Sequence, residues 1–167
     1  MYKSRSKVQN NLMAKYYNGS IRNLVYRLRK FKDIIDQELK DEIMRNEEVI
    51  VKMVAEEQLY EHGIKGRGIE IASYKPYAPR TIKKKQRKGQ PYNRVTLRDT
   101  GEFHKSLKVV FDDNGFYVTS TDDKAQYLLE RYGKTIFRLT NENLKILLNE
   151  YIRPSLKAKL KNFIQNG

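Results

Sequence analysis

The chain has 167 residues, a formal net charge of +14 and no cysteine. This length suits one domain with extended arms, and the lack of cysteine excludes disulfides and thiolate metal sites. The sequence has neither a run of about 18 apolar residues, as a membrane span needs, nor the apolar core of a secretory signal, so we expect a soluble intracellular product.

Positive charge is concentrated in two segments. Residues 1–19 hold four basic residues and no acidic one, and residues 71–98 hold nine basic residues and no acidic one. Charge gathered in this way points to a polyanionic partner or an acidic protein surface.

Residues 1–19 read as a flexible basic arm, and residues 20–62 as one long helix. After a Ser20 N-cap, apolar residues recur at spacings of three and four as far as Val54. A helix of about 40 residues at 1.5 Å each is longer than a compact domain of this size, so another subunit is expected to cover part of its stripe. Asn46 is a candidate restart point for the helix.

The remaining elements predict an α+β fold in which residues 20–167 form a single domain. A long N-terminal helix packs on a small antiparallel sheet with a central hairpin at 107–120, and C-terminal helices follow. Asn114-Gly115 suits a type I′ hairpin turn. A capped helix over 140–164 should kink at Pro154. Strands missing from the sheet come from 69–71, from 95–97 or from a neighbouring subunit.

Residues suited to catalysis are few, so no enzyme, cofactor or metal site is predicted. His62 and His104 stand in unrelated contexts and are expected to be solvated or helix-end residues. Asp112-Asp113 and Asp122-Asp123 resemble the carboxylates of two-metal nucleases, which keeps a nuclease as a minor alternative. Both pairs flank turns, where aspartate commonly makes local hydrogen bonds.

The basic loop 71–98 is the strongest candidate site, with a short helix expected between Pro79 and Gly89. Its cations, which can face DNA or a protein partner, are Lys75, Arg80, Lys83, Lys84, Lys85, Arg87, Lys88, Arg94 and Arg98. Tyr74, Tyr77 and Tyr92 flank them and can stack on bases. A solvated face and a contact with an acidic protein are the alternatives to nucleic acid.

The stretch "LRDTGEFHKSL" and its neighbours resemble the virion-morphogenesis proteins of tailed bacteriophages, a family of tail-completion, neck and head–tail joining proteins. "YKPYAPRTIKKKQ" before it and "YLLERYGKTIFRLTNENLKILL" after it match the family's order across residues 69–150. The matching motif residues are Leu97, Asp99, Thr100, Gly101, Phe103, Ser106, Leu107, Tyr127, Tyr132 and Gly133. Thr100 is also expected to cap a short helix carrying Phe103 and Leu107.

The resemblance implies a non-enzymatic structural subunit of the virion, made in the cytoplasm of the host bacterium. Such subunits form rings, of about six or twelve copies, at the portal–tail junction around the channel that DNA crosses. Its partners would be copies of itself, portal, connector or tail proteins and nearby packaged double-stranded DNA, with no membrane. The station in the neck or tail stays open, and the alternative is a stand-alone nucleic-acid-binding protein.

Overall fold

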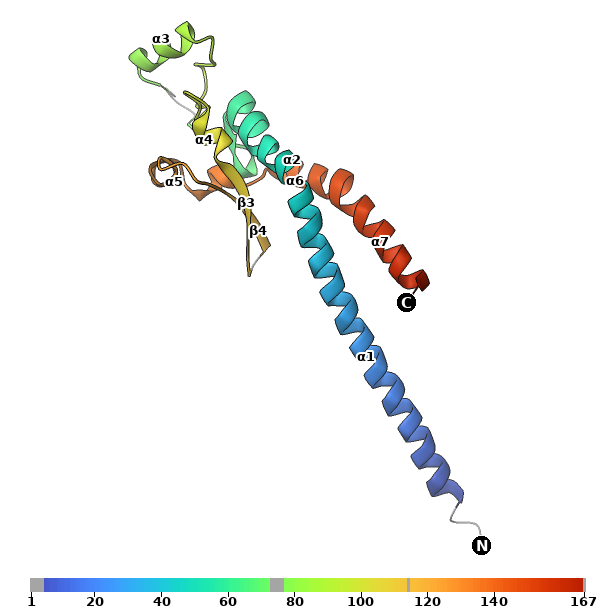
Figure 1. Ribbon diagram of the computed structural model, residues 1–167. Helices are drawn as coiled ribbons and strands as arrows, with labels where there is room; N and C mark the ends of the chain where they lie inside the picture. The colour runs from blue at the N-terminus through green and yellow to red at the C-terminus, as the bar shows by residue number, and fades with distance from the viewer. Residues whose placement is uncertain (1–4, 73–76, 114, 167) are drawn as a thin grey trace. The chain divides into compact units, whose positions relative to one another are not determined.

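The computed structural model describes residues 5–72, 77–113 and 115–166, with side chains for 21–72, 77–113 and 115–162 (Figure 1). The chain divides into two compact units, residues 1–41 and 42–167. The fold is α+β and mostly helical, with a long N-terminal helix and two small antiparallel sheets. The predicted class is therefore confirmed. In the described ranges, no helix is long and apolar enough to cross a membrane.

The first helix, α1, spans Arg5–Arg45 and so begins ahead of the predicted start at Ser20. Residues 5–19 contain no proline, and one interior glycine costs a helix only about 1 kcal/mol relative to alanine. Gly19 therefore does not end the helix. The predicted break at Asn46 is confirmed, because α2 begins after it and spans Glu47–Lys52. The Asn46 amide donates back to the Glu42 carbonyl at 2.8 Å rather than capping α2.

A π-helix, η1, follows over Met53–His62 and ends at Gly63, whose φ of +63° is left-handed. Gln58 is fully buried in η1 and binds the backbone before α6. Its Oε1 accepts from Thr140 N at 2.8 Å, and its Nε2 donates to Arg138 O at 3.1 Å. These bonds pair both polar atoms of the Gln58 amide, whose burial without partners would destabilise the fold.

The hairpin consists of β3, Leu107–Asp112, and β4, Gly115–Ser120. The register pairs Asp112 with Gly115, so Gly115 belongs to β4 rather than to the predicted Asn114-Gly115 turn. Asn114 lies outside the described residues. The helix α2 packs against β3, where Glu47 Oε1 accepts from Val109 N at 2.8 Å.

Two segments expected to extend the hairpin sheet do not do so. Ile69–Glu70 forms β2, but it pairs with β1, Ile64–Lys65, across the short turn η2 at Gly66–Gly68. Residues 95–97 form no strand, because Leu97 has a φ of +51° that breaks extended geometry.

The C-terminal part begins with α5, Ala125–Tyr132, and the 3₁₀ turn η3, Lys134–Phe137. Thr140 then caps α6, Asn141–Ile146, by accepting from Asn143 N at 3.1 Å. A π-helical segment, η4 at Leu147–Ile152, precedes α7, Arg153–Asn166. The helical hydrogen bonding thus changes just before Pro154, which lacks the N–H that would bond to residue 150.

The hydrophobic core of the second unit is formed by side chains of its helices together with Val95 from the segment that precedes the hairpin. Its most deeply buried apolar side chains are Ile50, Val54, Leu59, Val95, Ile136, Leu147 and Ile152. Val95 belongs to the predicted basic segment 71–98 and lies in this core, so that segment is attached to the body of the unit.

Candidate functional site

The predicted short helix in the basic segment is α3, Pro79–Arg87, with proline in its first turn. Gly89 follows with a φ of +62°, as expected where a helix ends. Arg80, Lys83 and Arg87 are exposed and follow one another at spacings of three and four. They therefore line one face of α3, and Lys85 lies on the opposite side.

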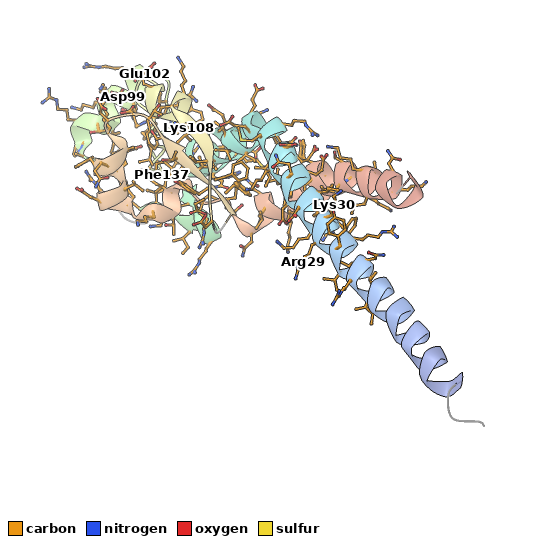
Figure 2. The ribbon with its side chains drawn as sticks, turned by 60° about the horizontal axis from the view of Figure 1, so that its bottom comes forward. Arg29, Lys30, Asp99, Glu102, Lys108 and Phe137 are labelled. Carbon is orange, nitrogen blue, oxygen red and sulfur yellow. The ribbon has the colours of Figure 1, made fainter. Side chains whose placement is uncertain are left out.

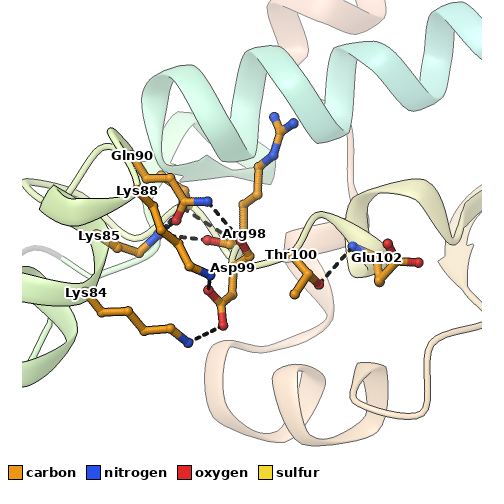
Figure 3. Close-up of polar contacts among 9 residues, drawn as sticks. Lys84, Lys85, Lys88, Gln90, Arg98, Asp99, Thr100 and Glu102 are labelled. Atoms are coloured by element: carbon orange, nitrogen blue, oxygen red, sulfur yellow. Dashed lines mark hydrogen bonds and ion pairs between the residues drawn. The ribbon is translucent and has the colours of Figure 1, made fainter.

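Asp99 holds two of the predicted DNA-facing lysines. Lys84 Nζ pairs with Asp99 Oδ2 and Lys88 Nζ pairs with Oδ1 (Figure 3). Gln90 Nε2 also donates to the Asp99 carbonyl at 2.8 Å. Because both lysines donate hydrogen bonds to it, the pKa of Asp99 falls from 3.8 to about 2. The motif residue Asp99 therefore partly neutralises the basic helix and anchors it.

Lys85 is 5% exposed and belongs to the interior rather than to a binding face. Its Nζ donates to Arg98 O at 2.7 Å and to Thr96 Oγ1 at 3.1 Å, and lies 4.9 Å from the centre of the Tyr77 ring. A buried ammonium satisfied by neutral oxygens and an aromatic face is a structural feature. The prediction that Lys85 faces a partner is therefore wrong for this fold.

Arg98 and Arg94 connect the segment to η1. Arg98 Nη1 contacts both oxygens of Glu56, at 2.9 and 3.2 Å, and its guanidinium lies 4.4 Å from the centre of the Tyr60 ring. Arg94 Nε donates to the Tyr60 carbonyl at 3.1 Å. These two arginines hold the loop against the helix.

The structure therefore sorts the predicted cations by role. Arg80, Lys83 and Arg87 form the exposed face of α3, which we call the α3 face. Lys75 and Tyr74 lie outside the described residues. Tyr77 OH accepts from Thr96 N at 2.9 Å, which ties this tyrosine to the fold, and Tyr92 is exposed. Sequence reasoning could not separate these roles, because Lys84 and Asp99 meet through the fold alone.

The segment "LRDTGEFHKSL", which resembles the phage proteins, forms the turn between the basic segment and the hairpin. Leu97 and Gly101 both have positive φ, at +51° and +95°. The helix α4 spans Glu102–Lys105, and Gly101 rather than the predicted Thr100 takes its N-cap position. The Thr100 hydroxyl still accepts from Glu102 N at 3.4 Å. Leu107 begins β3 and is not part of the short helix.

The side chains of the motif fix α4 to its surroundings. Phe103 is buried, and its ring centroid lies 6.0 Å from that of Phe137, which Figure 2 labels. Ser106 Oγ lies 2.6 Å from Ser120 Oγ and donates to Phe103 O at 2.7 Å. Gly133, at φ +84°, ends α5. These motif residues shape the fold.

A cavity of about 350 Å³ lies where the motif and the basic segment meet. Its lining mixes aromatic and apolar side chains with cations and carboxylates. Among the predicted residues it brings together Lys84, Lys85, Leu97, Arg98, Asp99, Thr100, Gly101, Phe103, Tyr127 and Tyr132. Tyr127 is exposed, and Arg131 Nη1 donates to its hydroxyl at 2.9 Å.

His104 is 4% exposed and lies in the last turn of α4, so it is the helix-end residue that the prediction allowed and not a solvated one. One ring nitrogen, Nε2, lies 2.9 Å from Thr96 O, while Nδ1 is buried with no hydrogen-bond partner among the described residues. Burial lowers the pKa of His104 below 6.5, and the nearby Arg98 and Lys85 charges act in the same direction. His62 is exposed at the end of η1, as predicted.

The two aspartate pairs lie where strands end: Asp112 is the last residue of β3, and Asp122 belongs to the bend after β4. Asp122 Oδ1 accepts from Lys124 N at 2.8 Å, and Asp122 N donates to Ser120 Oγ at 3.0 Å. In the described part of the chain, no group of three or more histidine, aspartate or glutamate side chains is placed to hold a metal ion.

Comparison with known proteins identifies no relative of this chain. The chain matches no protein-family model, no curated protein and no solved structure.

Proposed function

We propose that this protein is a non-enzymatic structural subunit of a tailed-phage virion. In this proposal it assembles as a ring at the portal–tail junction, around the channel that DNA crosses. The observation that carries the proposal is the role of Asp99. This motif residue pairs with Lys84 and Lys88, so the segment resembling phage morphogenesis proteins also positions the basic helix.

The α3 face supports a position near DNA. Arg80, Lys83 and Arg87 are exposed along one side of a helix that Asp99 holds in place. Such cations bind phosphates without reading sequence. A ring repeats the face in every copy and strengthens the field inside the channel.

The hairpin supports assembly between copies. Among the described residues β3 pairs only with β4, and β1–β2 is a separate sheet. A two-stranded hairpin is marginally stable alone, and its outer edges carry backbone groups that a neighbouring strand can pair with. Contact between the hairpins of adjacent subunits would complete the sheet.

Mass spectrometry of purified particles, together with native mass spectrometry of the chain alone and with portal and tail proteins, tests the proposal. The expected result is a fixed number of copies per particle and an oligomer or complex in solution. Absence from purified particles, combined with a strictly monomeric chain in the presence of those partners, would contradict it.

A stand-alone nucleic-acid-binding protein is the second candidate, favoured by the α3 face. It predicts tight DNA binding by the free chain in the absence of any virion component. It also predicts that the chain is missing from particles, which separates it from the first proposal.

A further inference from the structure

A hollow of about 1060 Å³ lies beside the β3–β4 hairpin in the second unit, and it shares no lining residue with the cavity at the motif. Its apolar lining includes Phe116 in β4, Phe137 in η3 and Leu144 in α6. Phe137 is buried, whereas Leu144 is 37% exposed and the lining residue Tyr117 is 47% exposed. Aromatic and apolar side chains that stay open to solvent in a hollow are typical of a binding site.

Three cations line the same hollow, and all three are exposed. Arg67 belongs to η2, Lys134 belongs to η3, and Arg138 directly follows η3. In the ranges with described side chains, no hydrogen bond or ion pair involves their charged groups. The carboxylate of Asp112 also lines the hollow, but it already has an interaction of its own. The lining is therefore apolar and carries an excess of positive charge.

The backbone positions two of these cations by close packing. Gly66 is buried against residue 138, where an added Cβ would lie 2.7 Å from the Arg138 Cβ, so only glycine allows this approach. Gln58 holds the same residue from η1, because its Nε2 donates to Arg138 O at 3.1 Å. Arg67 follows Gly66 with a φ of +71°, a left-handed conformation that arginine rarely adopts. The backbones that carry the two arginines are therefore held close together at the hollow.

The lining selects the kind of partner that this hollow can hold. Carboxylates pair with arginine through two parallel hydrogen bonds and with lysine as a point charge. Bulky apolar side chains that enter a pocket contribute most of the affinity at protein interfaces. Contacts with nucleic-acid phosphates need cations but make no use of an apolar lining. A protein segment that carries both carboxylates and apolar side chains is the ligand that fits both features.

We propose that this hollow docks an acidic segment of a partner protein. Apolar side chains of the segment enter the hollow against Phe116 and Leu144, and its carboxylates pair with Arg67, Lys134 and Arg138. The inference goes beyond the proposed function and does not depend on it, because the α3 face shares no residue with this hollow. Failure of one proposal therefore leaves the other standing.

Selection from a displayed library of random linear peptides, carried out on the full chain, tests the proposal. Enriched peptides should combine aspartate or glutamate with phenylalanine, tyrosine or leucine. Fluorescence anisotropy then compares the wild-type chain with the triple variant Arg67→Gly, Lys134→Gln and Arg138→Gln. Glycine suits the positive φ at position 67, so this variant should keep its fold, which circular dichroism checks. Its affinity for the selected peptides should fall about tenfold or more, because their carboxylates lose charged partners.

A matched control is needed, because a chain with a net charge of +14 attracts any acidic peptide. The variant Arg29→Gln, Lys157→Gln and Lys161→Gln removes the same charge from exposed positions in α1 and α7, and Figure 2 labels Arg29. This control should bind the selected peptides almost as tightly as the wild-type chain does.

A second pair of variants tests the apolar lining. Leu144→Ser should weaken peptide binding, because it removes an apolar side chain from the hollow. Leu148→Ser is the matched control, because Leu148 is 38% exposed and is not among the lining residues. Its affinity for the selected peptides should stay close to that of the wild-type chain.

Three outcomes would overturn the proposal. The selection could return no acidic peptides, or the two triple variants could lose affinity equally, which would assign binding to net charge. Oligothymidylate is the probe for the third outcome. If it binds the chain and loses affinity only in the variant with changes at 67, 134 and 138, while no acidic peptide is enriched, the hollow is a nucleic-acid groove instead.

Discussion

The ammonium group of Lys84 in α3 forms an ion pair with the carboxylate of Asp99, 15 residues further along the chain. Lys88 meets the second oxygen of the same carboxylate. This relationship joins the basic helix to the motif that resembles phage proteins. It also means that part of the positive charge of residues 71–98 is balanced by a carboxylate of the same chain.

The first prediction concerns the ionisation of Asp99. Its pKa of about 2 depends on the two lysines, so Lys84→Met with Lys88→Met should raise it toward 3.8. The stability that these ion pairs contribute should be present above pH 3.8 and be lost as the pH falls from 3.8 to about 2, because the unfolded carboxyl takes up its proton first. Carboxyl ¹³C NMR titration measures the midpoint directly. An unchanged midpoint in the double variant would show that the lysines do not hold Asp99.

The second prediction separates buried Lys85 from exposed Lys83. Lys85→Met removes the donor to Arg98 O and Thr96 Oγ1, and a buried acceptor left unpaired costs about 1–3 kcal/mol. Lys83→Met on the α3 face should change the free energy of unfolding by less than about 0.5 kcal/mol. Urea unfolding compares the two variants. Equal stabilities would mean that Lys85 does not hold the segment together.

The third prediction concerns the α3 face and DNA. Replacing Arg80, Lys83 and Arg87 with Gln should weaken binding to double-stranded DNA regardless of its sequence. The slope of log K against log salt should fall in magnitude by about 0.9 for each phosphate that the variant no longer neutralises. Fluorescence anisotropy at several salt concentrations measures both quantities.

Lys145→Gln, Lys157→Gln and Lys161→Gln form the matched control for the α3 face. They remove the same charge from exposed positions in α6 and α7. If the two triple variants lose affinity equally, binding reflects net charge rather than the α3 face.

The fourth prediction concerns acid sensitivity at His104. Its pKa is lowered in the native state by burial, so below about pH 6.5 the unfolded chain binds more protons than the native chain. The free energy of unfolding should therefore fall as pH drops below 6.5, by up to about 1.4 kcal/mol per pH unit for one proton. His104→Gln should flatten this dependence in denaturation measured between pH 5 and 8. A wild-type slope retained in the variant would assign the effect to other groups.

Local sequence signals predicted several parts of the fold, because helix ends and hairpin strands depend mainly on residues that are close together in the sequence. Asn46 before two glutamates marked the break between α1 and α2, and Gly63 marked the end of η1. Alternating apolar residues marked the hairpin, although its register places Gly115 in β4. Thr140 acts as the helix cap that its residue type favours.

Features that depend on contacts between residues far apart in the sequence could not be predicted from local sequence signals. The burial of Lys85 and the pairing of Lys84 with Asp99 arise only when residues 95–99 fold back on α3. Leu97 has a left-handed backbone that its residue type disfavours, so the sequence suggested a strand there. The split of the basic residues into anchors and an exposed face is therefore a result of the tertiary structure.

The most direct test of the proposed virion role is a cryo-EM reconstruction of the neck and tail of tailed-phage particles whose genome encodes this chain, which the proposal requires to exist. The account predicts a ring of copies around the DNA channel at the portal–tail junction, recognisable by α1 and the β3–β4 hairpin. A complete reconstruction in which every neck and tail density is assigned to other proteins would contradict it.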